Sequence, residues 1–185
     1  MGLEGQLWPV ERVGFSPAVC SKHHLVVHTN PNGALLAAAP MILEGIFKGE
    51  KTLYVLFENS QVDLIAVLKK KNGLPVNLLS KALETIRSEA VYLENGVFEP
   101  KRVLVFWEKK LLEAEHEGFS GLRIFGEMGW ILDHPSCYDA LLEYEASIDA
   151  FILNLSILAF CFYNSTRTGY DLVRQLLASH QVVHF

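Results

Sequence analysis

The sequence predicts an α/β fold in which helices cover both faces of a mainly parallel central sheet, giving a three-layer αβα sandwich. The strongest observation is residues 121–130, a buried-strand pattern that ends in Glu127, two glycines and Trp130. This stretch lies between two long amphipathic segments, and a strand between helical patterns is typical of β–α–β units. Residues 52–57 form a second apolar run, as expected for a strand covered on both faces. Ligands of such sheets bind at the carboxyl ends of the strands.

The first half of the chain alternates strand and helix patterns. Its predicted elements are a strand at 24–28, a turn at 29–33, a helix at 34–48, a strand at 52–57 and a helix at 61–71. The helix at 34–48 is apolar nearly all round, and Pro40 should kink it or end its first turn. Ser60 can cap the helix at 61–71, and Asn72-Gly73 should end it.

The second half continues the alternation. Its predicted elements are a helix at 75–87, a strand at 90–93, a turn at Asn95-Gly96, a helix at 100–117, the central strand, a helix from Ser136 to about 153, a strand at 156–163, a helix at 169–179 and a strand at 181–185. Pro100 is favoured in a first helical turn, and Gly118 should end that helix. The inward stripe of this helix is Val103, Trp107, Leu111 and Ala114. Ser136 and Asp139 have the spacing of a capping box.

Length and composition bound the class of protein. The 185 residues predict one domain at 22–185, preceded by an N-terminal extension at 1–21. The net charge of −5 argues against a general nucleic-acid or anionic-membrane surface. The longest apolar run, 151–163, is too short to span a bilayer. The chain opens without a signal segment, and its three cysteines do not suggest a disulfide framework, so we expect a soluble, cytoplasmic protein.

Glu127 and Trp130 are the leading candidates for a binding site, because both should emerge at the carboxyl edge of the sheet. We expect Glu127 to face a pocket lined by Trp130 and Tyr163, with Glu58 at the end of the neighbouring strand as a further contact. The alternative is that Glu127 accepts hydrogen bonds from the backbone N–H groups of a loop. The sequence leaves both interpretations open.

Glu145 is predicted to lie inside the apolar stripe of its helix, because Leu141, Ile148 and Ile152 surround it at helical spacing. A buried carboxylate needs a partner or stays protonated. Arg123, on the preceding strand, is the natural candidate. We therefore predict a structural ion pair between Arg123 and Glu145.

The histidines and cysteines do not predict a metal site. His24 and His28 share a strand face but lie about 13 Å apart at about 3.3 Å per residue, too far to bind one ion. The local pairs that could chelate are Cys20 with His23 or His24, and His134 with Cys137. Neither pair completes a familiar set of four ligands, so we expect no metal and no cofactor.

The sequence contains no phosphate-binding loop. The turn at 29–33 lacks the glycine pattern and the lysine followed by serine or threonine that hold phosphates and Mg²⁺. No nucleophile elbow is found either. We therefore predict that the protein is not an enzyme.

The order of several motifs resembles the methanogen/methylotroph sensory (MEDS) domain, over about residues 22–185. The motifs are His24, the run 43–55, the run 98–103, the run 122–130, Tyr144-Glu145 and residues 161–163. The most specific is Arg-x-x-Gly-Glu-Met-x-Trp at 123–130. One departure is Val26, where many members have a cysteine two residues after the first histidine.

The resemblance implies a RecA-like, Rossmann-like fold with a degenerate phosphate loop, and a ligand-sensing domain suspected to detect small C1, methyl or hydrocarbon derivatives in signal transduction or transcriptional regulation. The family pattern carries over onto His24, Arg123, Glu127, Trp130, Glu145 and Tyr163. Many members carry a DNA-binding or kinase module, and none fits in this chain. We expect output through a regulatory protein partner or a homo-oligomer, without direct nucleic-acid or membrane binding.

Three functions remain to be distinguished. The first is a non-catalytic sensor that binds a small ligand through His24, Glu58, Glu127, Trp130 and Tyr163. The second is a relic RecA-like nucleotide-binding protein or ATPase using Glu58 and Glu127, which the missing lysine and hydroxyl oppose. The third is an interaction module that docks a partner through the helix at 34–48 or the N-terminal extension.

Overall fold

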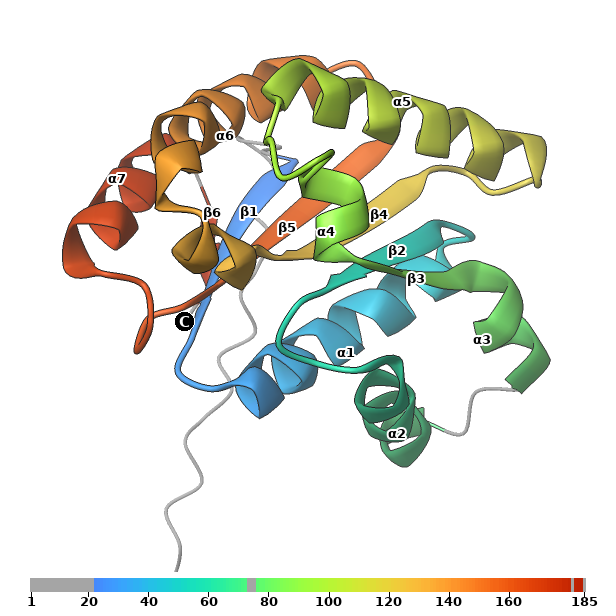
Figure 1. Cartoon of the computed structure of the whole chain (residues 1–185). Helices are drawn as coiled ribbons and strands as arrows, with labels where there is room; N and C mark the ends of the chain where they lie inside the picture. Colours follow the sequence, from blue (N-terminus) through green and yellow to red (C-terminus); the bar gives the residue numbers. More distant parts are fainter. Residues whose placement is uncertain (1–21, 73–75, 181, 185) are drawn as a thin grey trace, which may run out of the picture.

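The computed structural model describes residues 22–72, 76–180 and 182–184, and these form helices on both faces of one parallel sheet (Figure 1). The six strands lie in the order β3-β2-β4-β5-β1-β6 and every pairing is parallel. Their bounds are β1 His23–His28, β2 Lys51–Leu56, β3 Leu83–Arg87, β4 Leu122–Glu127, β5 Ile157–Asn164 and β6 Val182–His184. The predicted fold class and the central position of β4 are confirmed. The predicted N-terminal extension lies outside the described residues.

Helices α1 (Pro31–Phe47), α2 (Gln61–Asn72) and α3 (Val76–Ala82) cover one face of the sheet (Figure 1). The Asn30 side chain caps α1 by accepting a hydrogen bond from the Gly33 N–H at 2.9 Å, and Pro31 occupies the first turn. Pro40 lies inside α1, and the helix continues through it, so the prediction that Pro40 ends the first turn is wrong. Ser60 caps α2 as predicted, with its Oγ 3.2 Å from the Asp63 N–H.

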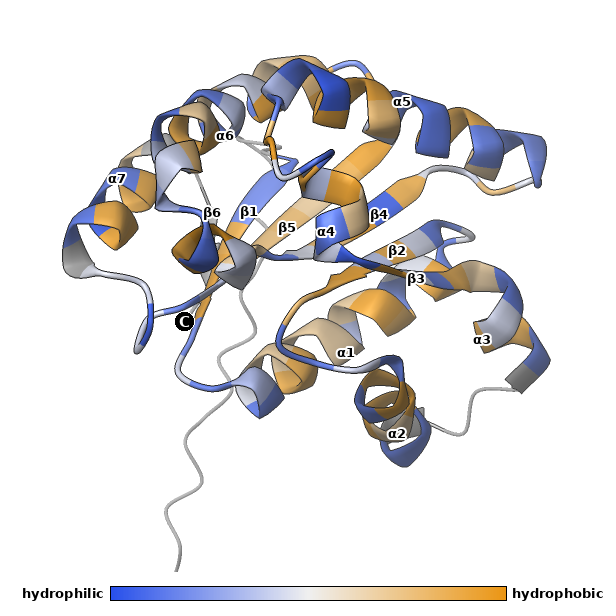
Figure 2. Cartoon of the chain, in the orientation of Figure 1, coloured by the Kyte–Doolittle hydropathy of each residue, from blue (hydrophilic) through white to orange (hydrophobic). Residues whose placement is uncertain are grey.

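Helices α4 (Ser88–Tyr92), α5 (Pro100–His116), α6 (Tyr138–Ile152) and α7 (Tyr170–Ser179) cover the opposite face (Figure 1). The predicted inward stripe of α5 is confirmed, since all four residues are buried. Figure 2 shows the resulting pattern, with hydrophobic residues on α1 and the central strands and alternating polar turns on α5. In the described parts of the chain, no helix is both long and apolar enough to cross a membrane.

Two predicted elements between α2 and α5 are wrong. The second half of the predicted helix at 75–87 is β3, which pairs along its length with β2 at the edge of the sheet. The predicted strand at 90–93 is instead α4, whose Val91 and Tyr92 are buried beneath α5. Short apolar runs of four or five residues fit either structure, and here tertiary packing decides. Gly126 leaves room for this packing, because a Cβ there would lie 2.6 Å from the Tyr92 Oη.

The start of α6 also differs from the prediction. Two 3₁₀ segments, Met128–Asp133 and Pro135–Cys137, lead into α6, which begins at Tyr138 without a side-chain cap. The predicted capping box at Ser136 and Asp139 is therefore absent. The first segment buries Gly129 and Trp130, and Gly129 lies so close to Phe57 that a Cβ there would be 2.7 Å from its ring.

Strand register decides which residues face which layer. On β4, Leu122 and Ile124 pack beneath α5 and α6, whereas Phe125 packs against the α1 layer. Glu127 pairs with Phe162 and His28 with Asn164, so the carboxyl ends of β1, β4 and β5 meet at one edge. By the alternation of strand side chains, Glu127 belongs to the α1 face.

Candidate functional site

A small hollow lies at the carboxyl edge of the sheet, where the sequence predicted a site. Its lining residues are His28, Glu58, Glu127, Gly129, Phe162 and Asn164. Its volume is about 10 Å³, which is room for about one water molecule. Two of the predicted ligand-binding residues, Glu58 and Glu127, lie here. Anything larger than one water molecule could enter only if the walls moved.

The Glu127 carboxylate holds the loop after β2 in place. Its Oε2 accepts the backbone N–H groups of Phe57, Glu58 and Asn59 at 2.7, 2.7 and 3.1 Å. Its Oε1 accepts the Tyr54 hydroxyl at 3.0 Å and the Asn59 side-chain amide at 2.6 Å. Five donors thus saturate two oxygens that are almost wholly buried. Of the two interpretations of Glu127, the structure shows the loop-binding one, although the side chain also borders the hollow.

Glu58 ties this loop to the turn that follows β5. One of its carboxylate oxygens forms an ion pair with Arg167, and the other accepts a hydrogen bond from the Asn164 side chain at 3.2 Å. Asn164 in turn accepts the Thr166 N–H and hydroxyl, at 3.1 and 2.7 Å. The turn at 164–168 is therefore fastened across the hollow. Because Arg167 is 44% exposed, its ion pair contributes little stability and can open at low cost.

His28 forms the β1 side of the hollow. Its Nδ1 lies 2.9 Å from the Asn30 carbonyl oxygen, so this nitrogen carries the proton in the bonded form. Burial lowers the pKa of His28, although the hydrogen bond to Asn30 and the charges of Glu58 and Glu127 oppose that shift. His28 is therefore neutral at pH 7 and leaves its other ring nitrogen as an acceptor.

The other predicted ligand-binding residues lie outside the hollow. His24 lies four residues before His28 in β1 and is buried, with its ring 4.8 Å from that of Phe160. Trp130 is fully buried, stacks on Tyr92 at 5.1 Å, and its Nε1–H has no acceptor among the described residues. Tyr163 faces α6, because side chains alternate along β5 and its neighbour Phe162 faces the α1 layer. The pocket predicted to combine Glu127 with Trp130 and Tyr163 is thus not present as such, and a ligand role for these residues stays a prediction.

The predicted ion pair between Arg123 and Glu145 is wrong. Arg123 lies on the α1 face, where its Nε donates to Glu50 at 2.6 Å and its Nη1 donates to the Met41 carbonyl at 2.8 Å. Glu145 lies on α6, which covers the opposite face. Alternation along β4 separates them, because residue 123 shares the parity of Phe125. Gly45 leaves space for Arg123, since a Cβ there would lie 2.8 Å from its Nε.

Glu145 instead belongs to a buried polar cluster with His23, Cys161, Tyr163 and His180. Tyr163 donates to its Oε1 at 2.6 Å, and the Nε2 atoms of His23 and His180 lie 3.1 and 3.2 Å from its Oε2. Burial alone would raise the pKa of Glu145, but the interactions with His180 and His23 outweigh it and hold this pKa far below its usual range. Likewise the Glu145 charge overcomes burial and raises the pKa of His180.

Sequence reasoning missed most of this cluster. His23 was considered only with Cys20, which lies outside the described residues, Cys161 only as part of the family motif at 161–163, and His180 not at all. The pair His134 and Cys137 does not belong to any cluster of potential metal ligands in the described residues. The alternation of side chains along the strands could have revealed the cluster. It places residues 23 and 161 on the face of the sheet that the inward stripe of α6 covers.

A family model for the "MEthanogen/methylotroph, DcmR Sensory domain" (MEDS) matches residues 22–181, nearly the whole chain. The chain belongs to the MEDS family. A search of curated proteins gave no match. The family description supports a sensory role for this MEDS domain without naming its ligand or partner.

The residues that carried the family resemblance fall into separate places in this MEDS domain. Glu127 organises the carboxyl edge, whereas Glu145 and Tyr163 belong to the buried polar cluster on the α6 face. Arg123 anchors α1 from the other face. The motif at 123–130 thus serves at least two structural purposes, and of its residues only Glu127 and Gly129 border the hollow.

Proposed function

We propose that this MEDS domain is a non-catalytic sensor that binds a C1 or methyl derivative in the hollow at the carboxyl edge of its sheet. The observation that carries the proposal is the hollow itself, which is about the size of one water and is bridged by a weak, partly exposed ion pair. A ligand of a few heavy atoms requires the walls to move apart, and the partly exposed pair of Glu58 and Arg167 is the contact that can open. A nucleotide needs far more.

The walls of the hollow suit a small molecule with one apolar and one polar end. The Phe162 ring and the Gly129 backbone offer an apolar side, while the Glu58 carboxylate, the Asn164 side chain and the neutral His28 offer hydrogen bonds. Small sites of this kind use a few polar groups to fix orientation. A methyl group against Phe162 and an amine, hydroxyl or thiol towards Glu58 would satisfy both sides.

Ligand binding would be read out through the turn at 164–168. A ligand that hydrogen-bonds to Glu58 competes with Asn164 and Arg167, and so loosens this turn, which leads directly into α7. A ligand shifts a conformational equilibrium only by the difference in its affinity for the two states. Release of the turn supplies that difference, and a partner protein or a second copy of the chain that contacts α7 would sense it.

The contacts at this edge support a binding rather than a catalytic role. Both Glu127 oxygens are saturated by donors, so this carboxylate is not available as a base. Glu58 is paired with Arg167. The charged residues that line the hollow are carboxylates, which would repel a triphosphate in the absence of the missing lysine. The ATPase alternative therefore has no feature in its favour here.

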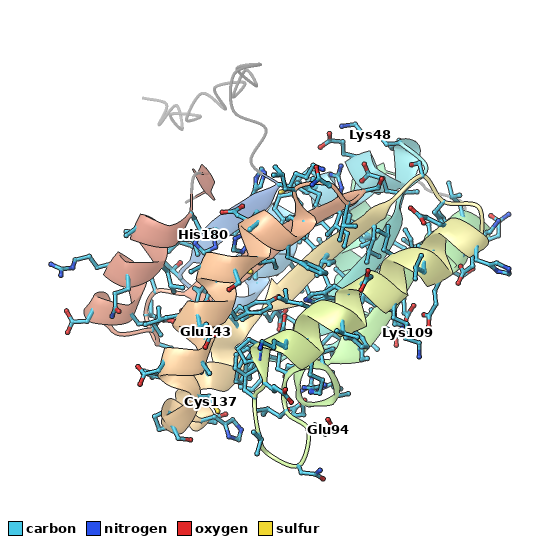
Figure 3. All side chains as sticks on the ribbon, turned by 90° about the horizontal axis from the view of Figure 1, so that it is seen from above. Lys48, Glu94, Lys109, Cys137, Glu143 and His180 are labelled. Atoms are coloured by element: carbon cyan, nitrogen blue, oxygen red, sulfur yellow. The ribbon has the colours of Figure 1, made fainter. Side chains whose placement is uncertain are left out.

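The proposal is tested by ligand-observed and protein-observed NMR of the full chain with methanol, methylamine, methanethiol, dichloromethane and Mg-ATP. We expect saturable shifts of amides in the loop 57–59 and the turn at 164–168 with at least one C1 compound. Glu58→Gln should weaken that binding by more than about tenfold, since it removes a charge that contacts the ligand. Glu94→Gln, at an exposed position in the turn before α5 that does not line the hollow, is the matched control (Figure 3).

The outcomes separate the alternatives. A panel without any saturable shift at this edge would overturn the sensor proposal. Binding of Mg-ATP in place of the C1 compounds would favour the nucleotide-binding alternative. Equal loss of affinity in Glu94→Gln would show that the effect of Glu58→Gln is not local.

A further inference from the structure

We propose that His23, Glu145, Cys161 and His180 form a binding site for one divalent transition-metal ion, with Zn²⁺ as the best fit. The site lies on the α6 face of the sheet and is distinct from the hollow at the strand ends. It goes beyond the proposed ligand sensing and does not depend on it. It also reverses our expectation from the sequence, which recognised no set of four ligands.

The four donor atoms already have nearly the spacing that a tetrahedral ion requires. The Nε2 of His23 lies 3.3 Å from the Cys161 Sγ, 3.1 Å from the His180 Nε2 and 3.1 Å from the Glu145 Oε2. The His180 Nε2 lies 3.2 Å from the same Oε2, and all four atoms lie within 4.8 Å of one another. Tetrahedral Zn²⁺ with bonds of about 2.0–2.3 Å sets its donors about 3.3–3.8 Å apart. To bind the ion, the pairs at 3.1–3.3 Å would open by a few tenths of an ångström, and the most widely separated pair, at up to 4.8 Å, would close by about 1 Å.

Hydrogen bonding alone accounts poorly for this convergence. The His23 Nε2 has three close heteroatom neighbours, namely a sulfur, a nitrogen and an oxygen. One imidazole nitrogen carries either a single hydrogen or a single lone pair, so it cannot serve all three contacts. An ion at the centre would use one lone pair from each of the four donors.

Neighbouring groups orient the donors as they do in known metal sites. The His180 Nδ1 lies 2.8 Å from the Leu176 carbonyl oxygen and therefore carries its proton, which leaves a lone pair on Nε2. The Asp149 carboxylate lies 4.0 Å from the His23 Nδ1, on the far side of that ring from the cluster. Tyr163 holds Glu145 Oε1 and leaves Oε2 to face the other donors. The hydrogen bonds of His180 to Leu176 and of Tyr163 to Glu145 are of the kind that fix the tautomer and the direction of metal ligands.

The donor set selects the kind of ion. Two imidazoles, a thiolate and a carboxylate suit Zn²⁺ better than Mg²⁺ or Ca²⁺, which prefer oxygen donors. The Cys161 thiol releases its proton to solvent as the sulfur–metal bond forms. Four protein ligands leave no open position for water, which is typical of structural rather than catalytic sites.

The ligands come from distant parts of the chain, so the ion would act as a cross-link. His23 begins β1, Glu145 lies in α6, Cys161 lies in β5 and His180 follows the last residue of α7. Figure 3 shows His180 between the end of α7 and the strands, on the side of α6 away from Cys137. The metal would fasten α7 and the start of β6 to the sheet.

Metal analysis and cobalt substitution test the site in the full chain. We expect about one equivalent of zinc in the purified protein. Unfolding with a chelator and refolding under reducing conditions with Co²⁺ should give a thiolate-to-cobalt charge-transfer band and the intense visible bands of a tetrahedral site. Zn²⁺ added afterwards should remove the cobalt spectrum.

Two variants and a matched control localise the ion. Cys161→Ser should abolish the charge-transfer band, and His180→Gln should weaken Co²⁺ binding by more than about tenfold. Cys137→Ser replaces the other buried thiol of the described residues, at the opposite end of α6, and should keep the full spectrum (Figure 3). Circular dichroism of each refolded variant shows whether it has folded.

The wild-type result decides the proposal even if a variant does not fold. Wild-type protein without bound metal that refolds without a cobalt spectrum would overturn it, and would leave a metal-free hydrogen-bonded network. A spectrum without a thiolate band, or one that survives Cys161→Ser, would also overturn it. Binding only at millimolar concentration, equal in all variants, would mean adventitious surface binding and would count equally against it.

Discussion

Glu127 and Glu145 are two buried carboxylates in one domain, and their surroundings are opposite in kind. Glu127 accepts five hydrogen bonds from neutral donors, three of them backbone N–H groups of one loop. Glu145 accepts one hydroxyl and turns its second oxygen towards two imidazoles and a thiol. The first environment supplies only donors, whereas the second gathers groups that can also present lone pairs.

The comparison distinguishes two uses of a buried charge. A carboxylate saturated by donors stabilises a fixed backbone conformation, and here it positions the loop at 57–59 beside the hollow. A carboxylate among other potential ligands is suited to binding a cation. Both carboxylates are buried, so burial does not reveal the difference. The identity and direction of the neighbouring atoms do.

The largest effect is expected for Glu127→Gln. In glutamine an NH₂ group replaces one of the two carboxylate oxygens. The donors that now bind that oxygen would face another donor, so these buried groups would lose their acceptor. We expect the free energy of unfolding to fall by about 3–5 kcal/mol, measured by chemical denaturation. The exposed Glu94→Gln should change it by less than about 0.5 kcal/mol. A loss below about 1 kcal/mol in Glu127→Gln would mean that the loop contacts are not important for stability.

Binding of Zn²⁺ should stabilise the protein through the cluster around Glu145 and not through the surroundings of Glu127. Zn²⁺ at 100–1,000 times its dissociation constant should raise the free energy of unfolding by about 3–4 kcal/mol, and a chelator should remove this gain. Because the sites lie on opposite faces of the sheet, Tyr54→Phe should keep the full increment, whereas Cys161→Ser should lose it. An equal increment in both variants would place the ion elsewhere.

Two tyrosines provide a matched pair. Tyr54→Phe removes one of two donors to the Glu127 Oε1, and the Asn59 amide remains. Tyr163→Phe removes the one hydroxyl donor found at the Glu145 Oε1. We expect losses of about 1 and about 2–3 kcal/mol respectively in the free energy of unfolding. The reverse order would show that Glu145 obtains compensation that Glu127 does not.

Much of the fold was predictable from sequence because its signals are local. The apolar run of β2, the stripe of α5 and the glycine after it each span a few adjacent residues, and all were confirmed. The errors at β3 and α4 occurred where short segments take their structure from long-range pairing and from burial beneath α5. Local patterns do not contain that information.

The site was less predictable than the fold. Strand geometry correctly placed Glu127 at the carboxyl edge, but the sequence could not show that three N–H groups of the next loop would occupy it. The buried cluster joins residues 138 and 157 positions apart in the chain. Only the strand order, which puts β1 beside β5, brings them together. The predicted Arg123 pair was wrong because Arg123 points from β4 to the α1 face, whereas α6, which carries Glu145, covers the other face.

The smallest effect is expected from His28, the titratable edge of the hollow. Burial lowers the pKa of His28, so between its ordinary value and the folded value the unfolded chain binds more protons. The stability that His28 contributes is therefore present above its ordinary pKa of about 6.5 and is lost as the pH falls through the folded value. His28→Gln should flatten this part of the profile when unfolding is measured from pH 7.5 to 5. An unchanged profile would mean that His28 stays accessible to water, and that the hollow at the strand ends is more open than its contacts with Asn30 and Phe162 indicate.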